Sequence, residues 1–114
     1  MEIRLVVIRT KDQKGLVEFY NLLGLTFDYH RHDNSPMHYS TTIGSLVLEI
    51  YPLAKDQTQT DKNLRLGFAI DNFEETLNLL NKNGIAFSKP VQTDFGFLTI
   101  VSDPDGRKIE LYKK

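Results

Sequence analysis

The chain of 114 residues contains no cysteine and no tryptophan, and its charges nearly cancel. The absence of cysteine excludes disulfides, thiolate metal ligands and a cysteine nucleophile. Lysine and arginine number 14 and aspartate and glutamate 15, which gives a net charge of −1. The chain therefore has neither the basic surface of a nucleic-acid-binding protein nor a polybasic membrane patch, and we expect no nucleic-acid and no membrane partner.

Long hydrophobic runs and glycine-rich loops are missing as well. The hydrophobic runs are far shorter than the ~20 residues that a membrane-spanning helix needs. The chain opens with a strand-like run, Ile3–Ile8, without the layout of a signal peptide. The seven glycines stand singly, so no phosphate-binding loop is present. We expect an intracellular, cytoplasmic protein.

The sequence contains the same unit of about 55 residues twice, which predicts two packed copies of one supersecondary motif. In the first copy, the expected strands are Ile3–Ile8, Thr26–Arg31, His38–Ile43 and Leu46–Tyr51, with a helix from a cap at Asp12 to Leu23. In the second, they are Leu64–Ile70, Ala86–Pro90, Phe97–Val101 and Lys108–Tyr112, with a helix over Phe73–Lys82 capped by Asp71 or Asn72. Gly24 and Gly84 supply the helix ends.

The order β-α-β-β-β, twice, predicts an α+β fold in a single domain, residues 1–114. We expect the first module over residues 1–51, a polar linker over residues 52–61 and the second module over residues 62–114.

Alternation along the strands gathers polar and aromatic residues on the face that does not pack the helices. These residues are Glu49, Tyr51, Arg65, Glu110 and Tyr112. Gly67 and Ala69 leave room beside them, which suits a concave sheet that holds a ligand. A solvated outer face of an antiparallel sheet shows the same alternation with nothing bound. Each tyrosine is more readily a wall of such a cavity than a general acid.

Three segments resemble the vicinal oxygen chelate superfamily, the group of glyoxalases, bleomycin-resistance proteins and extradiol dioxygenases. The segments are Phe19-Tyr20-Asn21-Leu22-Leu23-Gly24-Leu25, Leu46-Val47-Leu48-Glu49-Ile50-Tyr51 and Asp103-Pro104-Asp105-Gly106-Arg107-Lys108-Ile109-Glu110-Leu111-Tyr112. The resemblance spans the whole chain. It implies tandem βαβββ modules that form a cupped, partly open barrel, usually completed in a homodimer. It leaves the activity open, because the family includes lyases, isomerases, dioxygenases, thiol transferases and drug-binding proteins.

The resemblance also implies where a metal would bind, on the first, fourth, fifth and eighth strands. Those positions are Leu5, Glu49, Arg65 and Glu110 in this chain. Leucine offers no lone pair and arginine does not deprotonate in proteins, so neither can be a ligand. We expect no cofactor, and Arg65 to act as counter-ion to the two glutamates. The weaker alternative is a hard divalent cation such as Mg²⁺ on Glu49 and Glu110 alone.

The chain has three histidines, His30, His32 and His38, around one predicted hairpin. Exposed histidines in such a hairpin are more often polar surface than a displaced metal site. If they face the mouth of a cavity, they would make ligand binding depend on pH.

Three functions remain open at this point. The first is metal-independent binding of a small, partly aromatic molecule by the five polar and aromatic residues named above. The second is a metal-dependent lyase, isomerase or dioxygenase of the vicinal oxygen chelate type. The third is an enzyme without metal, or a regulatory module. Whether the protein is an enzyme is left undecided by the sequence.

Overall fold

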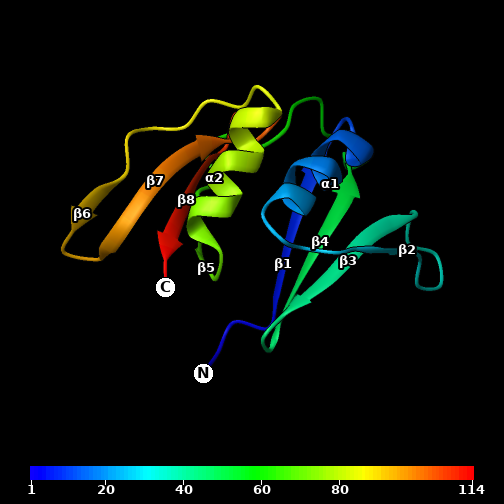
Figure 1. Ribbon diagram of the computed structural model, residues 1–114. Helices are drawn as coiled ribbons and strands as arrows, with labels where there is room; N and C mark the ends of the chain where they lie inside the picture. The colour runs from blue at the N-terminus through cyan, green and yellow to red at the C-terminus, as the bar shows by residue number, and fades with distance from the viewer. The chain divides into compact units, whose positions relative to one another are not determined.

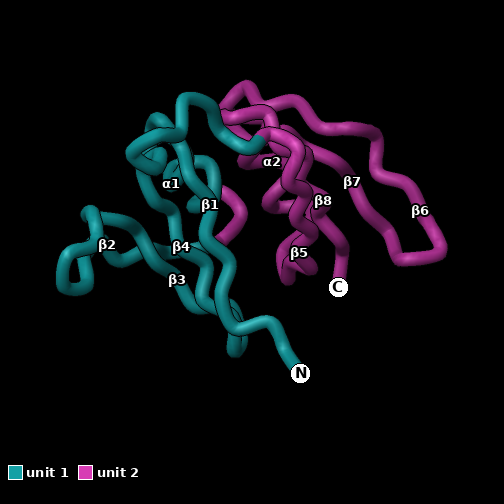
Figure 2. The backbone as a smooth tube through the Cα atoms, turned by 180° about the vertical axis from the view of Figure 1, so that it is seen from behind, with its two compact units in different colours: residues 1–21, 25–61 teal, residues 22–24, 62–114 magenta.

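The structure is a computed structural model that describes residues 1–114 and divides into two compact units. Unit 1 consists of Met1–Asn21 and Leu25–Asp61, and unit 2 of Leu22–Gly24 and Lys62–Lys114 (Figure 2). Each unit contains one helix and a four-stranded mixed sheet in the order β-α-β-β-β. The predicted α+β fold with two βαβββ modules is therefore confirmed.

Unit 1 is built on a sheet whose strands lie in the order β1-β4-β3-β2. Its elements are β1 (Leu5–Thr10), α1 (Gln13–Leu22), β2 (Asp28–His30), β3 (His38–Ile43) and β4 (Leu46–Pro52). Strand β1 is parallel to β4, and the other pairs are antiparallel. Helix α1 covers one face of this sheet (Figure 1). It begins after Asp12, whose Oδ1 accepts a hydrogen bond from the Gly15 N–H at 3.1 Å, as the sequence predicts for an N-cap.

Unit 2 repeats the plan in the order β5-β8-β7-β6. Its elements are β5 (Leu66–Ile70), α2 (Phe73–Lys82), β6 (Val91–Thr93), β7 (Gly96–Ser102) and β8 (Lys108–Lys113). Helix α2 has the predicted bounds and begins after Asn72, but the Asn72 side chain makes no capping hydrogen bond. The acidic residues of the first turn, Glu74 and Glu75, interact favourably with the helix dipole there.

The core of each unit lies between its helix and one face of its sheet. In unit 1 the buried apolar side chains include Ile8, Leu16, Phe19, Tyr20, Leu48 and Ile50; in unit 2 they include Ile70, Phe73, Leu80, Val101, Ile109 and Leu111. On the strands these residues alternate with partly or fully exposed ones. The opposite face of each sheet, which we call the open face, is therefore not covered by the helix of its own unit.

The prediction of a strand over Ala86–Pro90 is wrong. That segment makes a single isolated bridge, Phe87 to Val101, and the strand β6 follows it at Val91–Thr93. Two features explain the difference. Pro90 has no N–H to donate to a ladder. The hydroxyl of Ser88 accepts a hydrogen bond from the Ile100 N–H at 2.9 Å, so a side chain takes the place of a ladder bond.

The turn before β8 is held by a buried ion pair. Gly106 has a φ of 91° and donates its N–H to the Asp103 carbonyl at 2.9 Å, as the turn sequence predicts. The Asp103 carboxylate pairs with the Arg107 guanidinium at 3.1 Å, and both side chains are at most 1% exposed. Burial tends to lower the pKa of Arg107, but hydrogen bonds to Asp103 and Asp105 outweigh it and the pKa lies above its usual value.

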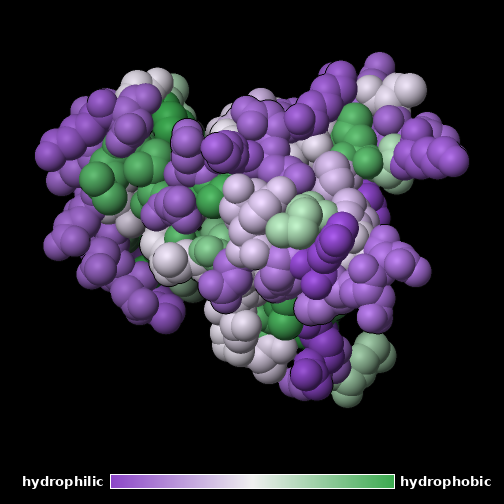
Figure 3. Space-filling view, turned by 90° about the vertical axis from the view of Figure 1, so that its right-hand side faces the viewer, coloured by the Kyte–Doolittle hydropathy of each residue, from purple (hydrophilic) through white to green (hydrophobic).

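No helix in the structure has the length and hydrophobicity to cross a membrane. On the side drawn in Figure 3, hydrophobic residues form small groups separated by hydrophilic ones. Among the exposed large hydrophobic side chains, Leu5 and Val7 lie together on the open face of β1.

Candidate functional site

On the open face of unit 2, Glu110 lies at the centre of a polar group. Its Oε2 accepts a hydrogen bond from Arg65 Nη2 at 2.6 Å, and its Oε1 accepts one from the Tyr112 hydroxyl at 2.7 Å. The Arg65 side chain is 58% exposed and that of Glu110 25%. Both carboxylate oxygens are thus engaged, while more than half of the Arg65 side chain remains open to solvent. We call Arg65, Glu110 and Tyr112 the arginine cluster.

Small residues make room for the Tyr112 ring. A Cβ added to Gly67 would lie 3.2 Å from Tyr112 Cε1, and one added to Gly96 would lie 3.4 Å from Tyr112 Cδ2. Gly67 pairs directly with Glu110 in the parallel ladder. The absence of side chains at the two glycines lets the ring lie close to the backbone, where it presents an apolar surface beside the ion pair.

The arginine cluster raises the pKa of the Tyr112 hydroxyl group. The hydrogen bond to Glu110, loss of hydration and the negative charge of Glu110 together raise the pKa of Tyr112 above its usual value, and the positive charge of Arg65 opposes them. Ionising Tyr112 would remove the donated hydrogen bond and place a second negative charge beside the carboxylate, which is the physical reason for the shift.

On the open face of unit 1, the equivalent glutamate lies among histidines. Glu49 Oε2 is 3.3 Å from His38 Nε2, and the two side chains are 12% and 0% exposed. The expectation that the histidines are surface residues is therefore wrong for His38. The ladder explains this placement: Ser40 pairs with Glu49 and Tyr39 with Ile50, so the His38 side chain lies on the same face as Glu49.

The hydrogen bonding of His38 fixes its tautomer. Its Nδ1 lies 2.9 Å from the Pro36 carbonyl oxygen, which can only accept, so Nδ1 carries a proton. Its Nε2 is buried and makes no hydrogen bond within the protein, although the Glu49 carboxylate is near. In the neutral imidazole, a lone pair at Nε2 thus faces a carboxylate oxygen. Two acceptors in contact repel each other unless a positive charge lies between them.

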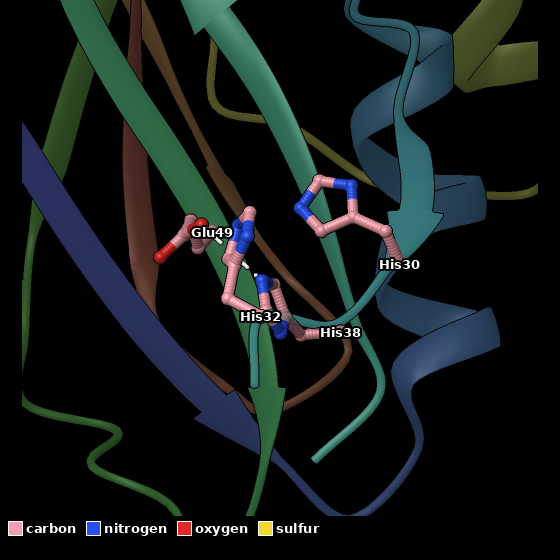
Figure 4. Close-up of side chains that lie close together, drawn as sticks. All are labelled: His30, His32, His38 and Glu49. Carbon is pink, nitrogen blue, oxygen red and sulfur yellow. Dashed lines mark ion pairs between the residues drawn. The ribbon is translucent and has the colours of Figure 1, made fainter. Parts of the chain in front are cut away.

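Two further imidazoles complete the group. His30, at the end of β2, and His32, in the loop after it, point towards His38 and Glu49 (Figure 4). One ligand atom from each of the four residues lies within 4.8 Å of the others. His30 Nε2 is also buried without a hydrogen-bond partner in the protein, a state that costs about 1–3 kcal/mol. We call these four residues the histidine cluster.

Tyr51 holds the histidine cluster from one side. Its ring stacks on the His38 imidazole, with centroids 4.1 Å apart and planes at 12°. The Arg9 guanidinium lies over the Tyr51 ring at 4.9 Å, and Arg9 Nη1 donates a hydrogen bond to the Pro52 carbonyl at 3.1 Å. Tyr51, predicted as part of a cavity wall, therefore orients an imidazole.

The four positions that the family resemblance assigns to metal ligands do not form a metal site of the usual kind. Leu5 offers no donor atom, and Arg65 holds one oxygen of Glu110 while Tyr112 holds the other. Leu5 and Glu49 belong to unit 1, and Arg65 and Glu110 to unit 2. A metal on Glu110 would have to displace a cation and a hydroxyl group. The chemistry of these residues does not fit that metal.

The fold and the open faces define a class of protein made of repeated βαβββ modules. The family model described as Glyoxalase/Bleomycin resistance protein/Dioxygenase superfamily matches residues 2–111. The chain belongs to this superfamily, which confirms the resemblance found in the sequence. A comparison with curated protein sequences finds no match.

Solved structures of similar fold include a binding protein and an enzyme. TnmS3, an antibiotic binding protein from Streptomyces sp. CB03234, is 21% identical, with a TM-score of 0.77 and coverage of 99% of this chain and 95% of TnmS3. The oxidase ChaP-H2 is 13% identical, with a TM-score of 0.80 and coverage of 100% and 94%. A superfamily member from Sphaerobacter thermophilus is 19% identical, with a TM-score of 0.75 and coverage of 100% and 98%. At these identities the likeness establishes the fold.

The sequence carries a signal for the histidine cluster in the turn between β3 and β4. The Gly44-Ser45 turn joins β3 to β4 with Ile43 opposite Leu46. Counting back from that turn places Ser40 opposite Glu49 and His38 beside it on one face. The alternation of faces alone grouped Glu49 with Arg65 and Glu110.

Proposed function

We propose that the protein binds a small, partly aromatic molecule with an anionic or strongly polar group, and that this binding needs no metal at the family's usual ligand positions. One observation supports this most directly. Arg65 makes one ion pair, through Nη2, and its side chain is more than half exposed beside Tyr112. A cation with free donors next to an apolar ring can bind a carboxylate or similar group together with a flat apolar body.

Membership of the superfamily and a structural relative described as an antibiotic binding protein support the same proposal. Within it, Arg65 binds the polar group, Glu110 orients Arg65, and Tyr112 forms the apolar wall. Glu49 and Tyr51, on the open face of unit 1, are the other two residues that we propose for ligand binding. We also propose that the protein is a homodimer, because exposed apolar side chains such as Leu5 on the open faces would be covered by a second copy. We propose a cytoplasmic location as well.

The experiment is a thermal-shift screen of aromatic carboxylates and related small molecules, followed by calorimetry on the hits. A ligand at about 100 times its Kd stabilises the folded state by about 2.7 kcal/mol. We expect Arg65→Ala to abolish that stabilisation and Tyr112→Phe to preserve most of it, because the ring remains. Lys113→Ala is the matched control, since it removes another cation of unit 2, one that pairs with Glu74 rather than with Glu110.

Equal ligand affinity in Arg65→Ala and the native protein would contradict the proposal. A library that contains both anionic and cationic aromatics sharpens the test, because only the anionic members should depend on Arg65.

A second candidate function is that of a metal-dependent lyase, isomerase or dioxygenase. The observation that favours it is the histidine cluster, because three imidazoles and a carboxylate are donors suited to first-row transition metals. Elemental analysis of the tag-free protein, before and after dialysis against Zn²⁺, Ni²⁺ and Mn²⁺, tests it first, because such an enzyme requires a bound transition metal.

A further inference from the structure

We propose that His30, His32, His38 and Glu49 bind one divalent transition-metal ion within unit 1. This site is different from the family's ligand positions, since three of its four donors come from β2, the loop after it and β3. It does not depend on the proposed function, whose central residue, Arg65, belongs to unit 2.

The spacing of the donors suits a single ion. Tetrahedral bonds of about 2.0–2.1 Å to one ion place the donor atoms about 3.3 Å apart. His38 Nε2 and Glu49 Oε2 are 3.3 Å apart, and the four ligand atoms lie within 4.8 Å of one another. The imidazole centroids are separated by 4.7, 4.8 and 5.4 Å. Rings that bind one ion in this geometry have centres about 5 Å apart.

The surroundings of His38 also match those of a metal ligand. Metal-binding histidines usually donate their second ring N–H to a carbonyl or carboxylate, which fixes the tautomer and turns the free nitrogen towards the ion. The Nδ1–H of His38 is directed to the Pro36 carbonyl in this way, and stacking on Tyr51 fixes the ring plane. The nitrogen left for the ion is the buried, unpartnered Nε2.

A proton cannot satisfy the cluster as one ion can. A proton on His38 Nε2 would compensate the Glu49 charge, but His30 Nε2 would stay buried without a partner. One cation at the centre of the group accepts lone pairs from all four residues at once. It would also neutralise the carboxylate, which is only 12% exposed.

The donor set selects the class of ion. Three imidazole nitrogens and one carboxylate oxygen suit Zn²⁺, Co²⁺, Ni²⁺ or Fe²⁺, whereas Mg²⁺ and Ca²⁺ prefer oxygen ligands alone. His32 is exposed, so the ion has an entry path from solvent on that side.

The test is titration of tag-free, chelator-treated protein with Zn²⁺ by calorimetry and with Co²⁺ by visible absorption. We expect one ion per chain and the absorption bands of tetrahedral Co²⁺. His30→Asn and His32→Asn should each weaken Zn²⁺ binding by at least about 10–100-fold, since removing only the hydrogen-bond partner of a metal ligand already has an effect of that size. Asp33→Asn is the matched control: it changes the neighbouring loop residue, whose φ of 49° asparagine tolerates, and should leave binding unchanged.

Nitrogen NMR of the imidazoles gives a second readout that does not depend on His38 variants, which are at risk of misfolding. Addition of Zn²⁺ should shift the Nε2 resonance of His38 while its Nδ1 remains protonated. Zn²⁺ binding that is absent, that is unchanged in both histidine variants, or that is lost equally in Asp33→Asn would overturn the proposal.

Discussion

The two units place equivalent glutamates in opposite chemical surroundings. In unit 1, Glu49 lies beside three imidazoles, whereas in unit 2 Glu110 is bonded to Arg65 and Tyr112. The same arrangement of strands thus places several metal-ligating groups around the glutamate of one sheet and a neutralising arginine beside the glutamate of the other. The repeat conserves the position of the carboxylate, and its neighbours determine its chemistry.

The ladders show which substitutions produce this difference. Across from Tyr112 on β7 lies Leu98, and across from Glu110 lies Ile100, so unit 2 has apolar residues where unit 1 has His38 and Ser40. On the parallel side, Val7 pairs with Glu49 and Gly67 with Glu110. The glycine gives the Tyr112 ring space to approach Glu110.

The cations also lie at different ends of the two first strands. Arg9 pairs with Tyr51 in unit 1, whereas the residue paired with Tyr112 in unit 2 is Ala69. Arg65, in contrast, precedes β5 and reaches Glu110. Each open face therefore has an arginine beside it: Arg9 lies over the Tyr51 ring in unit 1, and Arg65 is bonded to Glu110 in unit 2.

The largest effect is expected from the turn that leads into β8 and so positions Glu110. In unit 1, the corresponding connection is the short Gly44-Ser45 turn, but in unit 2 it carries the buried pair of Asp103 and Arg107. Asp103→Ala leaves the guanidinium without its buried carboxylate and should lower the free energy of unfolding by about 3–5 kcal/mol. Equilibrium unfolding in guanidinium chloride measures this loss of stability.

Asp105→Ala is the control for that experiment, because Asp105 pairs with the same guanidinium but its side chain is 15% exposed. We expect a smaller loss of stability than in Asp103→Ala. Equal losses in the two variants would mean that burial of Asp103 does not determine the strength of the turn.

The next effect concerns the tyrosine of the arginine cluster. Because the pKa of Tyr112 is raised in the folded protein, its contribution to stability is present below the unfolded pKa of about 10 and is lost as the pH rises through the folded value. Glu110→Gln should lower the pKa of Tyr112, and Arg65→Ala should raise it further. Phenolate absorbance measures both.

Five tyrosines are present, so the Tyr112→Phe variant assigns the transition by difference. If Glu110→Gln and Arg65→Ala moved the pKa in the same direction, the hydrogen-bond account of the cluster would be wrong.

The smallest effect is expected from the exposed ion pair itself. Arg65→Ala should change the free energy of unfolding by at most about 1 kcal/mol, since exposed ion pairs contribute about 0–1 kcal/mol. Thermal unfolding of this variant beside Lys113→Ala, which breaks another exposed pair, measures it. A loss as large as that of Asp103→Ala would show that Arg65 has a structural role that exposure conceals.

The order of the helices and strands and the pairing of Arg65 with Glu110 could be predicted from the sequence. Periodicity and the helix-ending glycines predicted both helices and seven of the eight strands to within a few residues. The prediction that Arg65 is the counter-ion to Glu49 and Glu110 is confirmed for Glu110. For Glu49 it stays a prediction. The sixth strand was predicted in the wrong place, because hydrophobic periodicity contains no information about two features. One is the tertiary hydrogen bond from the Ile100 N–H to the Ser88 hydroxyl, and the other is the missing N–H of Pro90.

The burial of the histidine cluster could not be predicted from the pattern of residue types. Composition marks His30, His32 and His38 as polar, and polarity suggests exposure. Burial of His38 follows from the register of β3 and from stacking on Tyr51, which are long-range contacts. Whether the five predicted ligand-binding residues contact a ligand stays a prediction.

The most direct test of the account compares the two glutamates in one measurement. Three tag-free proteins are compared: the native protein and the variants Glu49→Gln and Glu110→Gln. Each is stripped of metal with a chelator, dialysed against Zn²⁺ and analysed for bound metal. The account predicts one retained ion in the native protein and in Glu110→Gln, and little or none in Glu49→Gln. Retention that depends on Glu110, or that is the same in all three proteins, would contradict it.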